Sequence, residues 1–78
     1  MIHNKKILEK YANAFVSGLK PWEVRKNDCN YQVGDSIKFT VIDEQGEPTG
    51  RIYTSEIKYI FHGGQYGLEK GFCIITLD

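Results

Sequence analysis

The 78-residue chain has little of what marks several specialised classes of protein. It has only two cysteines, Cys29 and Cys73, which are too few and too far apart for a disulfide framework or a zinc ribbon. No run of 18 apolar residues occurs, and no apolar segment with a small-residue cleavage site follows Met1. These absences predict a cytoplasmic protein with reduced thiols, without a membrane span and without an export signal.

Neither sign of charge is in excess, because ten Lys and Arg residues balance ten Asp and Glu residues. Proteins that hold nucleic acid mainly through its phosphates usually carry a basic excess, so any binding of nucleic acid must come from a local patch. The residues that could ligate zinc, His3, Cys29, His62 and Cys73, are not at ligand spacing. No serine or cysteine stands in a recognisable nucleophile motif, and we expect neither a metal nor another cofactor.

What the chain does contain is enough for one folded domain, residues 1–78. Hydrophobic residues make up 41% and charged residues 26% of the sequence, which are ordinary values for a globular protein. A chain of this length buries roughly 60% of its unfolded surface on folding. We therefore expect one core and no large two-lobed active site.

An apolar stripe predicts one helix near the N-terminus. Its members recur at spacings of three and four, and they are Ile7, Leu8, Tyr11, Ala12, Phe15 and Leu19. Gly18 is typical of a helix end. Pro21 favours extended geometry in the residue before it, so the chain should pass directly into a strand.

This first strand should place Trp22 and Val24 on one side and Glu23 and Arg25 on the other. We expect Trp22 to belong to the core, because it shares its side with Val24.

Three further strands are predicted downstream. They cover residues 36–41, 51–61 and 72–77. A turn-rich connection, residues 27–34, precedes them, and residues 43–50 and 62–71 form the loops between them. The alternation slips in the second of these strands, which indicates a bulge near Ser55. The last strand is apolar on both sides, which is typical of a strand covered on both faces. Four strands and one helix predict an α+β, mainly β fold, in which the N-terminal helix packs on a small closed or folded sheet.

A set of short motifs resembles a known superfamily. The motifs are Gly18-x-Lys20-x-x-Glu23-x-Arg25, Lys26-Asn27-Asp28, Val33-Gly34-Asp35, Thr49-Gly50-Arg51 and the glycine-rich segment 63–72. Together they resemble the ASCH superfamily of small PUA-like domains associated with RNA, and within it the DUF3850-like proteins of bacteria and phages. The resemblance implies a PUA-like pseudobarrel with a mixed sheet, which agrees with the fold predicted from periodicity.

The first motif also predicts a ligand site. Glu23 and Arg25 lie two apart on one strand face, with roughly 7 Å between their α-carbons, and Lys20 lies at the mouth of the strand. In a cleft between helix and sheet, the two cations could hold a phosphate or carbonyl oxygen, while the carboxylate accepts from the amino group of a base. The alternative is a solvated salt bridge that orders the strand edge and contributes about 0–1 kcal/mol.

Further candidates come from the following turn and from the glycine-rich loop. The predicted ligand-binding set is completed by Asn27, Asp28, Gln65 and Tyr66. Tyr31 and Tyr53, like Tyr66 and Trp22, could stack on unpaired bases. Tyr66 is the favoured stacking residue, because binding residues concentrate in such loops; alternatively, the glycines serve only to turn the chain.

Three functions remain open. We expect first a module that binds single-stranded RNA or a nucleotide, and second a protein-interaction module that uses its charged strand face and an exposed sheet edge. The third is a small amidohydrolase acting on N4-acylated cytidines, an activity that the resemblance implies for some ASCH proteins. Their catalytic lysine matches Lys20, but Glu23 stands in place of their threonine, which removes its hydroxyl. Lys20 and Glu23 could still polarise a water, and they would then be the catalytic residues. We expect Arg25→Ala to weaken ligand binding and to leave the fold intact.

Overall fold

One five-stranded mixed sheet and one helix make up the computed structural model, which describes residues 1–78. The elements are β1 (Ile2–Leu8), α1 (Glu9–Val16), β2 (Trp22–Lys26), β3 (Ser36–Ile42), β4 (Pro48–His62) and β5 (Phe72–Leu77). The strand order is β1-β3-β4-β5-β2, with β1 parallel to β3 and all other neighbours antiparallel. The predicted α+β, mainly β class is confirmed.

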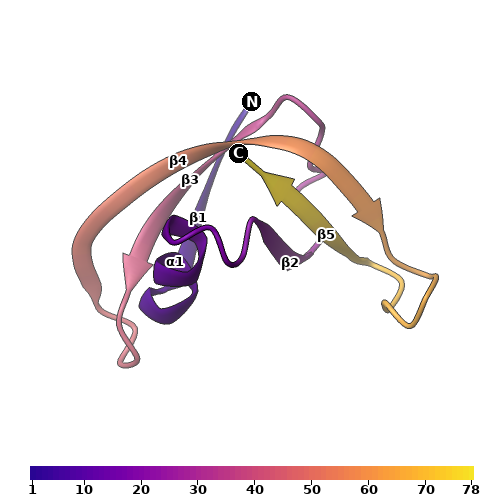
Figure 1. The fold of residues 1–78 in the computed structure, drawn as a ribbon. Coiled ribbons are helices and arrows are strands. Elements are labelled where there is room, and N and C mark those ends of the chain that lie inside the picture. Colours follow the sequence, from indigo (N-terminus) through magenta and orange to yellow (C-terminus); the bar gives the residue numbers. More distant parts are fainter.

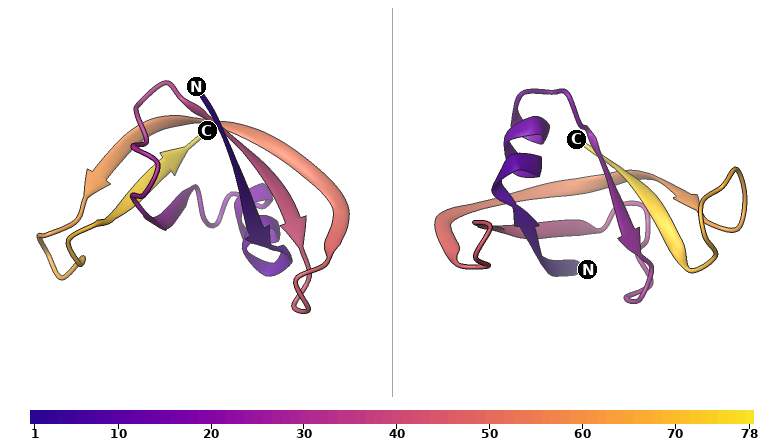
Figure 2. Two further views of the ribbon diagram at one scale, coloured as in Figure 1. Left: turned by 180° about the vertical axis from the view of Figure 1, so that it is seen from behind. Right: turned by 90° about the horizontal axis from the view of Figure 1, so that it is seen from below.

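The long strand β4 determines the shape of the sheet. Its first half pairs with β3 and its second half with β5, so β4 bends over the rest of the molecule like an arch, with α1 and β2 beneath it (Figures 1 and 2). The sheet therefore curls until its two edge strands, β1 and β2, approach each other. No backbone ladder joins them, but Arg25 Nη2 donates a hydrogen bond to the Lys6 carbonyl over 2.9 Å.

The core fills the inside of this curled sheet, with residues from α1, from the connection after β2 and from four of the strands. Its buried apolar members are Ile7, Ala12, Tyr31, Ile37, Phe39, Val41, Ile57, Cys73, Ile75 and Leu77. The alternation predicted for β3 is confirmed, because all three of its inward side chains are fully buried. In β5 one face is buried and the other is only partly covered, so this strand is not enclosed on both sides as predicted.

The end of α1 is set by Gly18. Gly18 has a φ of 80°, and its N–H donates to the Phe15 carbonyl over 3.0 Å, while the Leu19 N–H donates to the Ala14 carbonyl over 3.0 Å. This pair of hydrogen bonds is a Schellman motif, which glycine favours because it lacks a Cβ. The predicted helix end is confirmed, but Leu19 is 82% exposed and is not part of the apolar stripe.

The N-terminal segment is a strand, which corrects the prediction that the helix includes Ile7 and Leu8. Residues 2–8 pair in parallel with β3 along its whole length, with Ile7 opposite Val41 and buried. Only His3 and Ile7 of this strand are buried, and two lysines lie between them. Because the partner strand is about thirty residues away, local periodicity assigned Ile7 and Leu8 to the following helix.

The position of the bulge in β4 is a second correction. Ser55 pairs regularly with Ile37 and is buried. The register shifts instead between Ile57 and Tyr59, and a second shift in the β3–β4 pairing lies between Thr40 and Ile42. The β4 bulge marks the point where the strand exchanges β3 for β5 as its partner, which local alternation cannot reveal. No helix has the length and hydropathy that crossing a membrane requires.

A buried histidine fixes the start of β1. His3 Nε2 lies 2.8 Å from Asp35 Oδ2, and Asp35 also accepts from the Gln32 N–H over 3.2 Å and lies 3.4 Å from the Met1 ammonium group. These groups hold the pKa of Asp35 below its ordinary value of 3.8, and the His3 hydrogen bond has the largest effect. The carboxylate thus links the start of β1 to the loop before β3.

This contact predicts an acid-dependent loss of stability. A carboxyl group whose folded pKa is lowered stabilises the protein above its unfolded pKa, and the contribution is lost as the pH falls through the folded value. We expect the free energy of unfolding to fall below about pH 4, and to fall less steeply in Asp35→Asn, which is already less stable at neutral pH. Urea unfolding at pH 2.5–7 measures this, with the exposed Glu44→Gln as control; equal slopes for Asp35→Asn and the unsubstituted protein would contradict it.

Candidate ligand-binding site

The two faces of β2 are the reverse of what hydrophobicity predicts. Trp22 and Val24 share one side as predicted, but they are 44% and 48% exposed, whereas Glu23 on the other side is only 7% exposed. The expectation that Trp22 belongs to the core is wrong. Pairing with β5 explains the arrangement, because Glu23 and Arg25 stand beside the buried residues Ile75 and Cys73.

Three charged side chains meet on this inner face. Lys20 Nζ donates to Glu23 Oε1 and, over 2.9 Å, to the Trp22 carbonyl. Arg25 Nε lies 3.5 Å from Glu23 Oε2, and its guanidinium carbon lies 5.6 Å from the centroid of the Phe39 ring. One carboxylate therefore lies between two cations, and all three side chains are mostly buried.

Two buried polar atoms near Glu23 have no hydrogen-bond partner within the protein. Arg25 Nε and the Tyr53 hydroxyl are buried and make no hydrogen bond. Burial, followed by the negative charge of Glu23, raises the pKa of Tyr53 to about 12, so the hydroxyl stays protonated. Arg25 Nε remains within the ion pair with Glu23, and the Tyr53 hydroxyl is a donor that a water molecule can satisfy.

A surface hollow of about 360 Å³ opens at the start of β2. It is lined by Tyr11, Lys20, Trp22, Glu23 and Val24. Lys20 Nζ lies 5.3 Å from the centroid of the Tyr11 ring and 5.0 Å from that of the Trp22 ring. The hollow thus presents two half-exposed aromatic rings, one ammonium group and one carboxylate side by side.

Asn27 and Asp28 lie beyond the other end of β2 and do not line this hollow. Asn27 donates its N–H to the Gly71 carbonyl over 2.8 Å and accepts from the Tyr31 N–H at its side chain over 3.3 Å. Asp28 accepts from the Cys29 thiol over 3.2 Å and lies 3.8 Å from Lys5, and these two neighbours, in that order, lower its pKa. Both side chains hold the turn after β2 in place.

Gln65 and Tyr66 are also apart from the hollow. They lie in the β4–β5 loop, next to the end of β2 where Lys26 pairs with Phe72, whereas Lys20 precedes the opposite end. Gln65 Nε2 donates to the His62 carbonyl over 3.1 Å, and Tyr66 is 93% exposed with a φ of 50°. The predicted ligand-binding set is therefore divided among three places, and only Lys20, Glu23 and Arg25 meet.

The family model for the domain of unknown function DUF3850 matches residues 2–77. The chain belongs to the DUF3850 family. A search of curated proteins finds no match.

The DUF3850 fold also corrects the list of aromatic candidates. Tyr31 is only 2% exposed and packs edge-on against His3, with 4.8 Å between ring centroids, so it cannot stack on a base. Tyr53 stacks on Phe15 inside the sheet. Tyr11 was missed as a lining residue, because its place on the apolar stripe of the helix gave no sign of its exposure.

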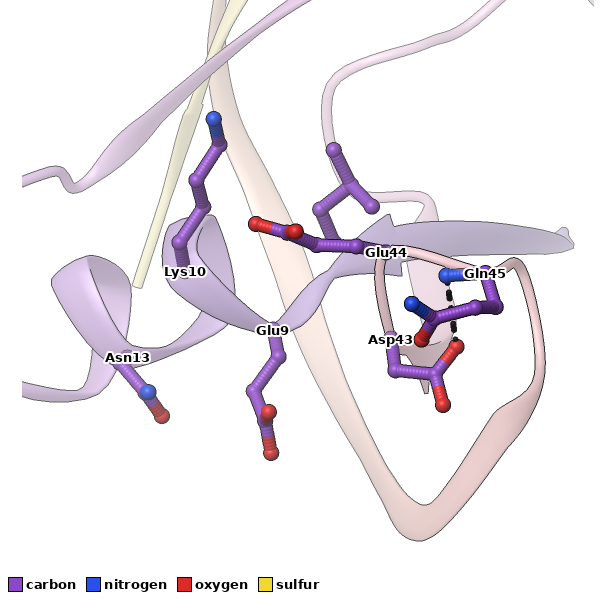
Figure 3. Close-up of a pocket in the computed structure, with 7 residues that line it drawn as sticks. Glu9, Lys10, Asn13, Asp43, Glu44 and Gln45 are labelled. Carbon is purple, nitrogen blue, oxygen red and sulfur yellow. Dashed lines mark hydrogen bonds between the residues drawn. The ribbon is translucent and has the colours of Figure 1, made fainter.

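This DUF3850 domain has a second hollow, of about 480 Å³, between the start of α1 and the β3–β4 turn (Figure 3). It is lined by Leu8, Glu9, Lys10, Asn13, Asp43, Glu44 and Gln45. Asp43 Oδ1 already accepts from the Gln45 N–H over 3.0 Å, and Asn13 accepts from Arg51 Nη1 over 2.8 Å. No group of three His, Cys, Asp or Glu side chains able to hold a metal ion occurs. The polar side chains here stabilise a turn and the helix, and they do not form a chemically distinct site.

Proposed function

We propose that this DUF3850 protein binds a nucleobase, within single-stranded RNA or a nucleotide, in the hollow at the start of β2. The observation that carries the proposal is the exposure of the Trp22 ring beside the mostly buried Lys20–Glu23 pair. A solvated salt bridge would leave both charged side chains in water and the tryptophan in the core. The reverse arrangement is typical of a site that stacks a flat ring and reads its polar edge.

Stacking supplies the sequence-tolerant part of such binding. Tyr11 and Trp22 are 43% and 44% exposed and border the same hollow. Stacking of one base on an aromatic side chain is worth about 1–3 kcal/mol. This interaction needs no basic excess, so it is compatible with the neutral formal charge of the protein.

The charged pair supplies the polar contacts. Glu23 can accept a hydrogen bond from an exocyclic amino group, and Lys20 can donate to a ring carbonyl or a phosphate. Arg25 acts as a positioning residue, since its guanidinium group is already engaged by Glu23, the Lys6 carbonyl and the Phe39 ring. The sequence predicts that Arg25→Ala weakens ligand binding and leaves the fold intact; because of the bond to Lys6, we expect it also to loosen the contact between β1 and β2.

Membership of the ASCH superfamily, with its PUA-like fold, is part of the proposal, as is a cytoplasmic location. Two observations support the superfamily: the Gly18-x-Lys20-x-x-Glu23-x-Arg25 order and a mixed sheet that curls around a short helix. In this interpretation, the first motif closes the helix with Gly18 and supplies the three charged groups at the start of the next strand.

Titration of the 15N-labelled protein with cytidine 5′-monophosphate tests the hollow. We expect amide shifts at Tyr11 and residues 20–24, and about tenfold weaker binding in Lys20→Gln. The matched control is Lys10→Gln, because Lys10 also lies over the Tyr11 ring, at 5.1 Å, but does not line the hollow. An absence of shifts at millimolar nucleotide, or equal weakening in both variants, would refute the proposal.

The contact between Lys20 and Glu23 also favours the amidohydrolase alternative, in which this pair polarises a water. Two features argue against it. The Lys20 ammonium group already donates to Glu23 and to the Trp22 carbonyl, and Glu23 stands where the ASCH amidohydrolases have a threonine hydroxyl. Incubation with N4-acetylcytidine decides between binding and hydrolysis. Release of cytidine that is lost in a Glu23→Gln variant shown by circular dichroism to be folded at the assay temperature would establish the enzyme. Absence of cytidine release at high protein concentration would exclude this substrate.

A further inference from the structure

The outer face of β2, β5 and the second half of β4 is apolar and largely aromatic. Its apolar members are Trp22, Val24, Phe72, Ile74, Tyr59 and Phe61, and Thr76 stands between Trp22 and Tyr59; we call this surface the outer face. The registers place these side chains in rows across the three strands: Val24 pairs with Ile74, which pairs with Phe61. All six project away from the core, because the residues between them on each strand face inward.

The exposure of this face is unusual for a protein surface. Trp22, Val24 and Tyr59 are 44%, 48% and 61% exposed, and the other three are half-buried. The ring of Tyr66, 93% exposed, lies over the edge of the face with its centroid 6.2 Å from that of Phe61. Exposed apolar residues usually stand singly on a protein surface and need no explanation. A contiguous exposed apolar patch, by contrast, marks an interaction site.

The rows of the outer face hold one charged side chain. Lys26, which pairs with Phe72, is the one ionisable group that β2 and β5 direct outward, and Lys20 lies against the Trp22 ring at the border. Glu23, the one carboxylate in these two strands, faces inward, and beyond Tyr59 the exposed Lys58 of β4 pairs with Glu56 over 3.1 Å and with Asp78 over 3.8 Å. Rows of aromatic rings with lysines beside them, and with no carboxylate within the rows, suit a ligand that has flat rings and negative charges, namely a single nucleic-acid strand.

The outer face is continuous with the hollow. Trp22 and Val24 belong to both, since they line the hollow and are the residues that β2 contributes to two neighbouring rows of the face. A strand whose base occupies the hollow would therefore leave it directly across the rows of the outer face.

We infer that the outer face is a stacking platform for single-stranded nucleic acid, which binds the nucleotides next to the base held in the hollow. The inference rests on the proposed function for its ligand class and adds that the ligand is an oligonucleotide. A sheet face of this size accommodates about two or three stacked bases.

Binding of ribo-pentacytidylate and of cytidine 5′-monophosphate, measured by amide shifts and by Trp22 fluorescence, tests the platform. We expect the oligonucleotide to bind at least tenfold more tightly, with shifts on Tyr59, Phe61 and Ile74 that the mononucleotide does not cause. Tyr59→Thr should weaken only the oligonucleotide, by about tenfold for one lost stack. The matched control is Ile52→Thr, because Ile52 is 58% exposed on the other half of β4.

Salt dependence tests the charges. Two lysine–phosphate contacts on a single strand predict a slope of log K against log salt of about −1.4, and Lys26→Gln should reduce its magnitude by about 0.7. Lys38→Gln is the control, because Lys38 is exposed on β3, away from the outer face. Deoxy-pentacytidylate distinguishes RNA from DNA, since only RNA offers a 2′-hydroxyl group.

The outcomes separate the two proposals. Mononucleotide binding in the hollow without any gain for the pentanucleotide would overturn the platform and leave the hollow standing. Pentanucleotide shifts on the outer face without mononucleotide binding would support the platform and overturn the hollow. Binding of neither, or a dimer that Tyr59→Thr converts to a monomer, would overturn the platform; the dimer would assign the face to contact between copies of this chain.

Discussion

Glu23→Gln is expected to lower the free energy of unfolding by about 3 kcal/mol, although glutamine has almost the same shape as glutamate. The substitution removes the one negative charge between Lys20 and Arg25, so two mostly buried cations would face each other without a counterion. Breaking a buried ion pair by removing one partner is costly for this reason. For a domain of this size the melting temperature should fall by roughly 12–24 °C, measurable by circular dichroism.

The matched control for this prediction is Glu56→Gln. Glu56 lies 3.1 Å from Lys58, and the two side chains are 47% and 51% exposed. An exposed pair of this kind contributes about 0–1 kcal/mol. If both variants lost the same small amount of stability, the charges around Glu23 would be solvated, contrary to our interpretation of the site.

A single methyl group at Gly63 is expected to be at least as damaging. A Cβ on this residue would overlap the Glu69 carbonyl oxygen and lie 2.7 Å from the Phe72 carbonyl oxygen. Both obstacles are backbone atoms, and the Gly63 N–H donates to the same Phe72 carbonyl over 2.8 Å. Gly63→Ala must therefore open the β4–β5 loop, and we expect a loss of at least about 3 kcal/mol in urea unfolding, within the range of severe single substitutions.

Its neighbour provides the control. Gly64 has a φ of 92°, but the nearest atom to an added Cβ is Lys70 Cβ at 3.9 Å. Gly64→Ala should therefore cost only the backbone strain of a left-handed conformation, about 1–2 kcal/mol. A larger loss in Gly64→Ala than in Gly63→Ala would show that backbone conformation, and not close approach, governs this loop.

Alternation along β2 predicted which residues share a side, but not which side is buried. The structure confirms that Trp22 and Val24 lie on one side of the strand and that Glu23 and Arg25 lie on the other. The inward face carries the charges because these compensate one another and because Arg25 also bridges to β1. Such compensation depends on three-dimensional neighbours, so residue hydrophobicity alone assigned the faces wrongly.

The candidate site was predictable only where it is local. Lys20, Glu23 and Arg25 lie within six residues of each other, and the geometry of one strand brings them together. The position of Tyr66 depends on where the β4–β5 hairpin lies. That placement follows from the bulge between Ile57 and Tyr59, where β4 exchanges β3 for β5 as its partner. Strand β1 was missed for a similar reason, since its pairing with β3 is long-range and parallel.

The order of the strands also has a consequence for how the chain folds. The β3–β4 and β4–β5 hairpins join neighbours in sequence, whereas β2 pairs with β5 some fifty residues later. Closing such long loops precedes any gain from the contacts, so folding should be slow for a small domain, on the millisecond-to-second scale. During synthesis the Trp22–Lys26 segment has no strand partner until residues 72–77 are made, and its exposed aromatic edge is open to chaperones or to other nascent chains throughout that interval.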